Sequence, residues 1–372
     1  MKIVSRGILN QGESGTNRAV STFPTLTRLA DGSLLATYRV GSTKDSDDEQ
    51  LELRRSTDSG LTWTDPTRPF STALDGVSGS LKLGYITELE PDRLLLVAMW
   101  VDRESYPGQP LFNEETEGAL PIKILLADSF NNGEYWSSWR VVPTGPEIGP
   151  PSLTNPILKL PSGRLAMSIE TNKTYEDTSP WHQQVVYLYS DDQGSSWSAP
   201  LTVSRDPGGR IFNWDQRAGV DEQGRLATFS WTYNRQTNTY LNVHRRISLD
   251  EGANWTAAED LGFADQASHP AILADGRIIL AWVDRFGSRS IRARIAEAVD
   301  QPFSADSEVE LYRLPDTAPT GTGRQTGELL TQMGLWNFGL PFAETLPDQS
   351  ALVVYYEGHV ENMWISWARL AP

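Results

Sequence analysis

Three copies of the pattern Ser-x-Asp-x-Gly-x-x-Trp leave few folds open to this 372-residue chain, because tryptophan is rare and chance repetition is not expected. A fourth copy carries Asn131 at the Asp position. In a tight turn Asp accepts backbone hydrogen bonds, Gly adopts a positive φ, and Trp packs onto the sheet. Each copy therefore predicts a β-hairpin turn, in which Asp58, Asp192 and Asp250 are structural. The copies are residues 56–63, 129–136, 190–197 and 248–255.

A second repeat has the form apolar-x-x-x-Asp-Gly-x-Leu-Leu and predicts a hairpin that joins two strands. Segments with period-two alternation flank both repeats from end to end. Each unit then reads strand, hairpin, strand, variable loop, strand, Asp-containing hairpin, strand. Six such units predict an all-β fold, a six-bladed β-propeller of four-stranded antiparallel blades, in a single domain over residues 1–372. The six copies are residues 29–35, 89–95, 160–165, 220–226, 273–279 and 346–352.

The charge balance excludes two classes of partner. The chain has 32 Lys and Arg against 48 Asp and Glu, a net charge of −16, so it would repel nucleic acid and anionic membranes. No apolar run approaches the roughly 20 residues of a membrane-spanning helix. We therefore expect local binding sites, with no nucleic-acid or membrane partner. The sequence leaves the oligomeric state open.

The absence of cysteine excludes disulfides, thiolate metal sites and a cysteine nucleophile. The four histidines have no metal-binding spacing, and no phosphate loop, nucleotide fingerprint or serine nucleophile elbow occurs, so no metal and no cofactor is expected. Residues 1–7 lack the apolar core of a secretory signal, which favours a cytoplasmic protein. An exported protein whose leader has been removed would have the same sequence.

The repeats resemble those of the sialidase-like β-propeller superfamily, also called the BNR or Asp-box repeat family, over nearly the whole chain. The C-terminal segments at residues 351–358 and 363–366 resemble the closing blade of sialidases. This resemblance implies the propeller fold. It implies less about function, because Asp boxes also occur in lyases, in other hydrolases and in non-catalytic propellers.

Strand direction within each unit predicts which face of the propeller carries the functional site. Both kinds of hairpin lie on one face, so the start of each first strand and the end of each second strand lie on the other. Arginines, carboxylates and aromatic residues are expected to meet there, which suits a polar or acidic sugar. The expected residues are Arg39, Asp45, Asp102, Arg103, Glu170, Asp215, Arg217, Trp231, His269, Asp284, Arg285, Tyr356 and Glu357.

The resemblance also implies roles for some of these residues. Sialidases hold the substrate carboxylate with three arginines, use an Asp as acid/base, and use a Tyr activated by a Glu as nucleophile. Arg39 and Asp45 match the first-blade Arg and acid/base Asp, with Asp47 and Asp48 as rivals for the latter. On this basis Asp45 and Glu170 are the predicted catalytic carboxylates, and Arg39 and Arg285 are predicted to bind substrate.

Three departures from the family leave the sialidase machinery incomplete. The Arg-Ile-Pro motif reads Thr22-Phe23-Pro24, and the Asn-Glu-Pro motif reads Thr154-Asn155-Pro156. The segment expected to hold the nucleophilic Tyr reads Asn337-Phe338-Gly339-Leu340-Pro341. We therefore expect the propeller scaffold and the site on this face to be retained, with a reaction chemistry that differs from that of sialidases.

Several candidates have a structural interpretation beside the functional one. Asp45 lies in a polar segment that would equally form a solvated loop. The pairs Asp102-Arg103 and Asp284-Arg285 follow equivalent strands, and each pair would either bridge neighbouring blades or offer its Arg to a substrate carboxylate. His269 would either pack in the funnel wall or act as a base.

The function predicted from these observations is an exo-acting glycoside hydrolase of sialidase-like architecture that acts on an acidic or polar terminal sugar. The carbohydrate substrate is the one partner expected. One alternative is a polysaccharide lyase for uronate-containing glycans, with a Tyr or His base and an Arg that neutralises the uronate. The other is a non-catalytic glycan-binding propeller.

Overall fold

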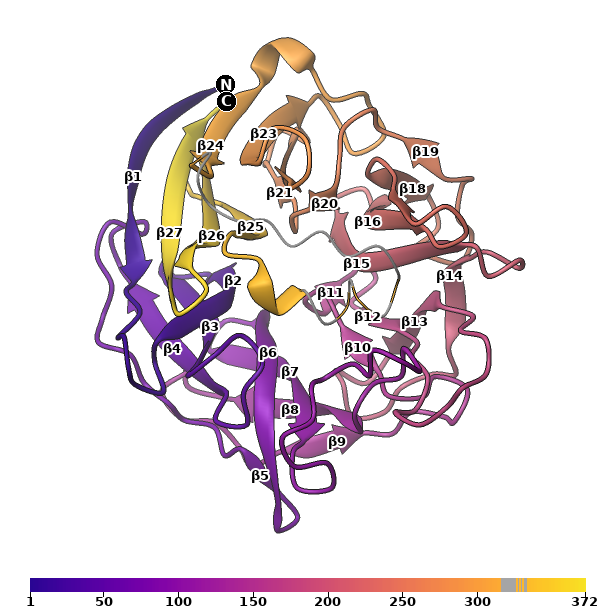
Figure 1. Ribbon diagram of the computed structural model, residues 1–372. Coiled ribbons are helices and arrows are strands. Elements are labelled where there is room, and N and C mark those ends of the chain that lie inside the picture. Colours follow the sequence, from indigo (N-terminus) through magenta and orange to yellow (C-terminus); the bar gives the residue numbers. More distant parts are fainter. Residues whose placement is uncertain (316–325, 327, 329, 331–332) are drawn as a thin grey trace.

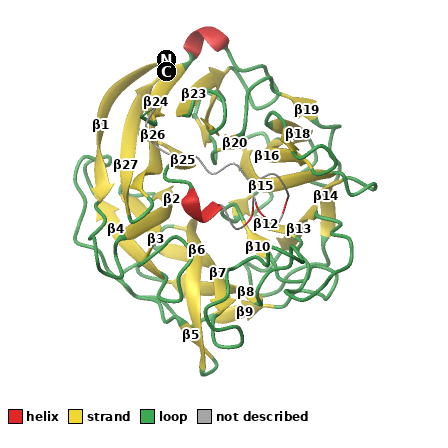
Figure 2. Cartoon of the chain, viewed as in Figure 1, coloured by secondary structure: helices red, strands yellow, loops and turns green. Residues whose placement is uncertain are grey.

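The computed structural model describes residues 1–315, 326, 328, 330 and 333–372. In that part of the chain the secondary structure is almost entirely β-strand, as predicted, with two short 3-10 turns at η1 (Ala305–Ser307) and η2 (Met333–Leu335). Figure 1 shows the strands arranged in a ring, with the two termini side by side and η2 near the middle. Figure 2 shows that loops run around the periphery.

The strands form five sheets within the described residues, and their paired strands are antiparallel except for one parallel pair. One sheet combines the first and last parts of the chain, in the order β25 (Gly339–Thr345), β26 (Ala351–His359), β27 (Asn362–Ala371), β2 (Val20–Arg28), β3 (Leu34–Gly41) and β4 (Gln50–Ser56), with β1 (Lys2–Asn10) also paired to β27. The next sheet contains β5 (Ala73–Leu74), β6 (Val77–Glu90), β7 (Arg93–Asp102), β8 (Ile122–Ser129) and β9 (Arg140–Val142).

The remaining three sheets follow in chain order. The first contains β10 (Ser152–Leu153), β11 (Leu158–Lys159), β12 (Leu165–Glu170), β13 (Gln184–Ser190) and β14 (Leu201–Arg205). The second contains β15 (Ile211–Val220), β16 (Leu226–Asn234), β17 (Thr239–Tyr240), β18 (His244–Ser248) and β19 (Glu259–Asp260). The third contains β20 (Gln266–Ala267), β21 (Ala271–Ile272), β22 (Ile278–Asp284), β23 (Ser290–Ala296) and β24 (Val309–Arg313).

The ring closes by strand pairing between the two ends of the chain. β1 pairs antiparallel with β27, from Lys2 opposite Ala371 to Asn10 opposite Ile365. One parallel pair, Val20 with Met363, joins β27 to β2 and so merges two groups of strands into one sheet. The first and last strands of the chain are therefore neighbours in one sheet.

All six copies of the Asp-Gly repeat connect antiparallel strands. The strand ends that they join are opposite each other in register, as in Arg28 with Leu34 and Val220 with Leu226. The same holds for β6–β7, β11–β12, β21–β22 and β25–β26. Turn residues and period-two alternation therefore predicted these hairpins correctly.

The four Ser-x-Asp/Asn turns share one set of hydrogen bonds. In the first, Gly60 N donates to Ser56 Oγ over 2.9 Å, and Thr62 N donates to Asp58 Oδ1 over 2.9 Å. The turns at Ser129, Ser190 and Ser248 repeat both bonds. Hydrogen bonds to its carboxylate, first from the hydroxyl and then from the backbone N of Ser196, lower the pKa of Asp192 to about 2. These carboxylates are structural, as predicted.

Irregularities in the inner strands direct side chains toward the centre of the ring. The register shifts between Thr22 and Thr25 in β2, Leu81 and Leu83 in β6, Trp214 and Arg217 in β15, and Gly339 and Phe342 in β25. Such bulges re-aim a side chain. The displaced residues Phe23, Lys82, Asp215 and Leu340 all line one central cavity. The backbone of Phe23, Asp215 and Leu340 has positive φ, between 45° and 51°.

We expect Gly60→Ala to destabilise the protein more than Gly32→Ala, which is a matched control. Both glycines have φ near +85°, so each Ala costs about 1–2 kcal/mol of backbone strain. A Cβ at Gly60 would also lie 2.5 Å from Leu352 of β26, which is fully buried, whereas a Cβ at Gly32 meets nothing within 4 Å. Overpacking should add about 1–3 kcal/mol, measured by denaturant unfolding. Equal losses in the free energy of unfolding for the two variants would show that Leu352 of β26 is not tightly packed against the turn after β4.

Candidate active site

A cavity of about 200 Å³, partly open to solvent, lies at the centre of the ring. One part of its wall is aromatic and apolar, and the other part carries charged and polar side chains. Of the predicted site residues, those that line it are Asp45, Glu170, Asp215, Trp231, Arg285 and Tyr356. The sequence therefore identified carboxylates, an arginine and aromatic residues that the fold does bring together. The other seven predicted residues do not line it.

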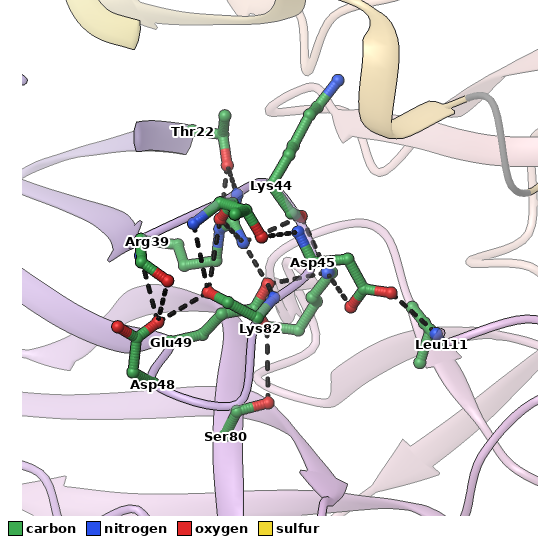
Figure 3. A network of polar contacts seen from close by, with 12 residues as sticks. Thr22, Arg39, Lys44, Asp45, Asp48, Glu49, Ser80, Lys82 and Leu111 are labelled. Atoms are coloured by element: carbon green, nitrogen blue, oxygen red, sulfur yellow. Dashed lines mark hydrogen bonds and ion pairs between the residues drawn. The ribbon is translucent and has the colours of Figure 1, made fainter. Parts of the chain in front are cut away.

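Asp45 lies in the loop between β3 and β4 and belongs to a charged network (Figure 3). Its Oδ1 accepts hydrogen bonds from Lys82 Nζ over 3.0 Å and Arg103 Nη2 over 2.6 Å, and its Oδ2 accepts one from the backbone N of Leu111 over 2.7 Å. Burial alone would raise the pKa of Asp45, but Lys82 and Arg103 outweigh it and hold that pKa well below the usual value. In this geometry Asp45 is an ionised carboxylate fixed at the pocket wall, and not a free carboxylate of a solvated loop.

Arg39 lies behind the pocket wall and is fully buried. It forms an ion pair with Glu49, and its Nε and Nη2 donate to Thr22 Oγ1 over 2.9 and 2.6 Å (Figure 3). The ring of Phe23 lies over the guanidinium, with 5.8 Å between the ring centroid and Cζ. The prediction that Arg39 binds substrate is therefore not supported by this geometry, because protein acceptors take up the guanidinium and Phe23 covers it.

Glu170 and Asp215 form the second carboxylate group of the pocket. Glu170 ends β12, and its Oε1 accepts a hydrogen bond from the backbone N of Gln216 over 2.9 Å. Burial, followed by the nearby charge of Asp215, raises the pKa of Glu170 to about 8. Asp215 pairs with Arg217 Nη2 over 2.7 Å and accepts a hydrogen bond from the amide of Gln266. The site thus places a neutral carboxylic acid beside an ion-paired carboxylate. In such a pair the two environments move the pKa values apart, so that one group can act as an acid and the other as a base.

Arg217 and His269 lie beneath this group. Arg217 Nη1 donates to Tyr85 Oη over 2.8 Å and to the backbone oxygen of Thr154. His269 stacks on Phe342 with 4.5 Å between ring centroids, and its Nδ1 lies 3.1 Å from Asn155 Oδ1. Burial and the charge of Arg217 lower the pKa of His269 to about 3. The packing interpretation of His269 fits this position.

Arg285 enters the pocket against the aromatic wall. Its Cζ lies 4.2 Å from the ring centroid of Trp336 and 5.4 Å from that of Trp231. Trp231 also contacts Trp214, with 5.9 Å between ring centroids. Aromatic faces of this kind stack on the apolar faces of sugar rings. The prediction that Trp231 and Arg285 belong to the site agrees with their position.

Asp102, Asp284 and Glu357 were expected at the pocket, but the structure places them outside its lining. Asp102 caps its own loop, accepting from the backbone N of Glu104 and Ser105, and Asp284 does the same for Gly287 and Ser288. Glu357 accepts a hydrogen bond from Ser366. Arg103 also does not line the cavity, and it links β7 to Asp45 and Glu49. These residues stand at or near strand ends as predicted, but other protein groups take up their polar atoms: neighbours in the chain for Asp102 and Asp284, Ser366 for Glu357, and the carboxylates of the β3–β4 loop for Arg103.

Several residues that shape the site are not among those predicted from the sequence. Lys82 donates to Asp45, to Glu49 and to the backbone oxygen of Lys44. Its position as a single charge between Leu81 and Leu83 in an apolar strand was a usable signal. Glu49, Lys44 and Trp336 gave no comparable signal, because their roles depend on contacts between distant strands. Gln266 holds both Asp215 and Arg285 through its amide.

Neither a metal site nor a membrane-spanning helix is found in the described part of the chain. There, no group of three or more His, Asp or Glu side chains is placed to hold a metal ion. No helix in those residues has the length and apolar character needed to cross a bilayer.

No protein-family model and no curated protein matches the sequence. Solved structures do match it over nearly its whole length. A protein of unknown function from Dyadobacter fermentans superposes with a TM-score of 0.71 at 20% identity, covering 99% of both chains. The intramolecular trans-sialidase from Ruminococcus gnavus superposes with a TM-score of 0.66 at 14% identity, covering 100% of this chain and 98% of that one. The NanB sialidase from Streptococcus pneumoniae superposes with a TM-score of 0.65 at 13% identity, covering 98% of this chain and 70% of that one. The predicted resemblance to sialidase-like propellers is confirmed at the level of fold.

Proposed function

We propose that this chain of sialidase-like fold is an exo-acting glycoside hydrolase that removes an acidic or otherwise polar terminal sugar. We further propose that residues 1–372 form one six-bladed propeller, because six strand groups follow each other around the ring and each begins with an Asp-Gly hairpin unit. The similarity to solved sialidases supports the proposed architecture. The proposed reaction is argued from the residues of the pocket.

The observation that carries the proposal is the unequal pair Glu170 and Asp215. With a pKa of about 8, Glu170 is protonated at neutral pH and can donate its proton to the glycosidic oxygen as the bond from the anomeric carbon breaks. Water then adds to the anomeric carbon, and a carboxylate accepts the proton that the water loses. Asp215 and the ionised Asp45 are the pocket carboxylates that can accept this proton or stabilise the positive charge of the transition state.

This proposal changes the roles that the sequence suggested. Asp45 was predicted as the acid/base, but its ion pairs with Lys82 and Arg103 keep it ionised, which suits a base and not a proton donor. Glu170 was predicted as the second carboxylate, and its burial makes it the proton donor here. The aromatic wall around Trp231 provides a stacking surface for the sugar ring.

The two alternatives become outcomes of the test. A lyase needs a base at the pocket. The candidate histidine, His269, packs against Phe342 outside the lining, so Tyr356 would have to be that base. A binding protein without turnover fits the apolar Phe23 and Leu340 at positions where the resemblance implies polar catalytic segments.

Product analysis by mass spectrometry tests the proposal. We expect the pure protein, incubated with sialosides, uronate-containing oligosaccharides and neutral oligosaccharides, to release a hydrated terminal sugar from at least one of them. Products lighter by one water would replace the hydrolase with a lyase. Saturable binding without any product would replace it with a binding protein.

A further inference from the structure

Lys44 is a half-buried lysine of the pocket lining whose hydrogen-bond partners are all uncharged. Its Nζ lies 2.7 Å from the backbone oxygens of both Met333 and Trp336, and 2.8 Å from Tyr356 Oη. No carboxylate of the described residues is within ion-pair distance of this amine. The proposed hydrolytic mechanism gives Lys44 no role, so its chemistry needs a separate account.

The surroundings of Lys44 favour the uncharged amine. Burial is the main cause that lowers the pKa of Lys44 well below its usual value, and the charges of three nearby cations lower it further. Those cations are Arg285, Arg39 and Lys82. Lys82 lines the same pocket, but two carboxylates supply its counter-charge. A lysine that is desolvated, or that lies beside other cations, is a nucleophile near neutral pH.

The three hydrogen-bond partners also match an uncharged amine. A backbone oxygen can only accept, so the oxygens of Met333 and Trp336 each take one N–H of Lys44. The lone pair of the amine is then left for Tyr356. Its hydroxyl, 2.8 Å from Nζ, can donate to that lone pair, because its contact with the backbone oxygen of Trp336 is longer, at 3.4 Å. Burial raises the pKa of Tyr356 to about 12, so the hydroxyl keeps its proton near neutral pH.

A small molecule can reach this amine. Lys44 lines the central cavity, and it also borders an open groove of about 840 Å³ whose walls include Thr16, Ser42 and Val360. A Cβ at Gly339, opposite Tyr356 in the β25–β26 register, would lie 3.3 Å from Tyr356 Oη. The glycine therefore keeps room beside the hydroxyl that contacts Lys44.

We propose that Lys44 is a nucleophilic amine that forms an imine with the carbonyl group of an open-chain sugar, with Tyr356 as the proton carrier. The lone pair of Nζ attacks the carbonyl carbon, and the electron pair of the C=O bond moves to the oxygen. Both hydrogens of the amine then leave with that oxygen as water, passing through the Tyr356 hydroxyl, and a C=N bond remains. Tyr356 ends the reaction with one proton, as it began, and no oxidant or reductant is consumed.

The inference rests on the proposed function in taking the carbonyl compound to be a sugar. Hydrolysis of a glycoside releases a free reducing end, and the open-chain form of that sugar carries an aldehyde or a ketone. The pocket then holds its own product through a covalent bond, which is reversible because water hydrolyses an imine.

Reductive trapping tests the inference. The pure protein is incubated at pH 7 with glycolaldehyde and sodium cyanoborohydride, which reduces an imine to a stable secondary amine, and the labelled peptides are followed by mass spectrometry. The chain has six lysines, so each can be followed separately. We expect Lys44 to be labelled at least ten times faster than Lys123, an exposed lysine on β8. An exposed lysine is almost fully protonated at pH 7 and therefore reacts slowly.

A second arm replaces glycolaldehyde with glucose, galactose or N-acetylmannosamine. At least one of these reducing sugars should label Lys44, whereas their alditols, which have no carbonyl group, should not.

Variants then assign the reaction to its residues. Lys44→Arg should remove the fast adduct from the mass of the intact protein, and the control Lys123→Arg should keep it. Tyr356→Phe should slow the labelling of Lys44 ten times or more and leave that of Lys123 unchanged. Thermal unfolding shows whether each variant is folded. The comparison of Lys44 with Lys123 is made within the wild-type protein, so it does not depend on any variant.

Labelling of Lys44 no faster than that of Lys123 would overturn the inference, as would preferential labelling of any other lysine. Labelling by glycolaldehyde but by no sugar would overturn the assignment of the ligand, and an unchanged rate in Tyr356→Phe would overturn the proton transfer. The proposed function is judged separately. Hydrolysis of a glycoside with an unreactive Lys44 would keep the hydrolase and remove the imine. A reactive Lys44 without hydrolysis would keep the imine and remove the hydrolase.

Discussion

Glu170→Gln is expected to lower kcat by about 10²–10⁴-fold while the protein remains folded. Glutamine has the shape of the protonated acid and its carbonyl can accept the hydrogen bond from Gln216 N, but it has no proton to give to a leaving oxygen. The measurement is initial rates on the substrate identified by product analysis, with thermal unfolding as the check on folding. A variant with wild-type rates would show that Glu170 is not the proton donor.

The pH dependence gives this prediction a second readout. Because Glu170 must be protonated to act, the activity of the wild type should fall as pH rises through about 8. The raised pKa also means that the folded protein holds a proton that the unfolded chain has lost above its ordinary pKa of 4.5. The contribution of Glu170 to stability therefore declines as pH rises from about 4.5 to about 8, and Glu170→Gln should remove this part of the pH dependence.

Glu344→Gln is the matched control. Glu344 on β25 is another glutamate whose pKa burial raises, to about 7, but it does not line the pocket. Its replacement should change the pH dependence of stability in the same sense and leave kcat unchanged. A comparable loss of kcat in both variants would mean that the effect of Glu170→Gln reflects a general disturbance of the inner strands.

Glu49→Gln is expected to lower the free energy of unfolding by about 3–5 kcal/mol, since it removes the shared partner of buried cations. Glu49 has no exposed surface and pairs with Arg39, which is equally buried. Its carboxylate also contacts Lys82 Nζ at 2.8 Å and Arg103 Nη2 at 3.3 Å. The amide keeps the shape of the side chain but leaves Arg39 without a carboxylate partner among the described residues, Lys82 with Asp45 alone, and Arg103 with Asp45 and the exposed Asp47. Urea unfolding at pH 7 measures the loss.

Asp47→Asn is the control for this variant, because Asp47 belongs to the same loop and lies 3.8 Å from Arg103 but has 58% of its side chain exposed. A surface pair of this kind contributes about 1 kcal/mol or less. Similar losses for the two variants would contradict the view that Glu49 organises this side of the pocket.

Part of the candidate site could be recognised from the sequence. Glu170, Asp215, Trp231 and Arg285 stand at strand ends whose direction follows from the hairpins before them, and the pocket includes all four. The same reasoning also selected Asp102 and Asp284, because strand direction fixes where a residue lies but not which atoms it contacts. Both cap local turns instead.

The sequence by itself determined the strands, their hairpins and the Ser-x-Asp turns. These follow from turn chemistry and period-two alternation, which act over a few residues and recur in every repeat. Only the tertiary structure decided which charges are available to a ligand. Arg39 is occupied by Glu49, whereas Lys44 has no carboxylate partner in the described residues, and Glu170 is protonated through its burial near Asp215. The reason is that burial and charge pairing depend on side chains from different strand groups, whose proximity exists only after the ring has closed.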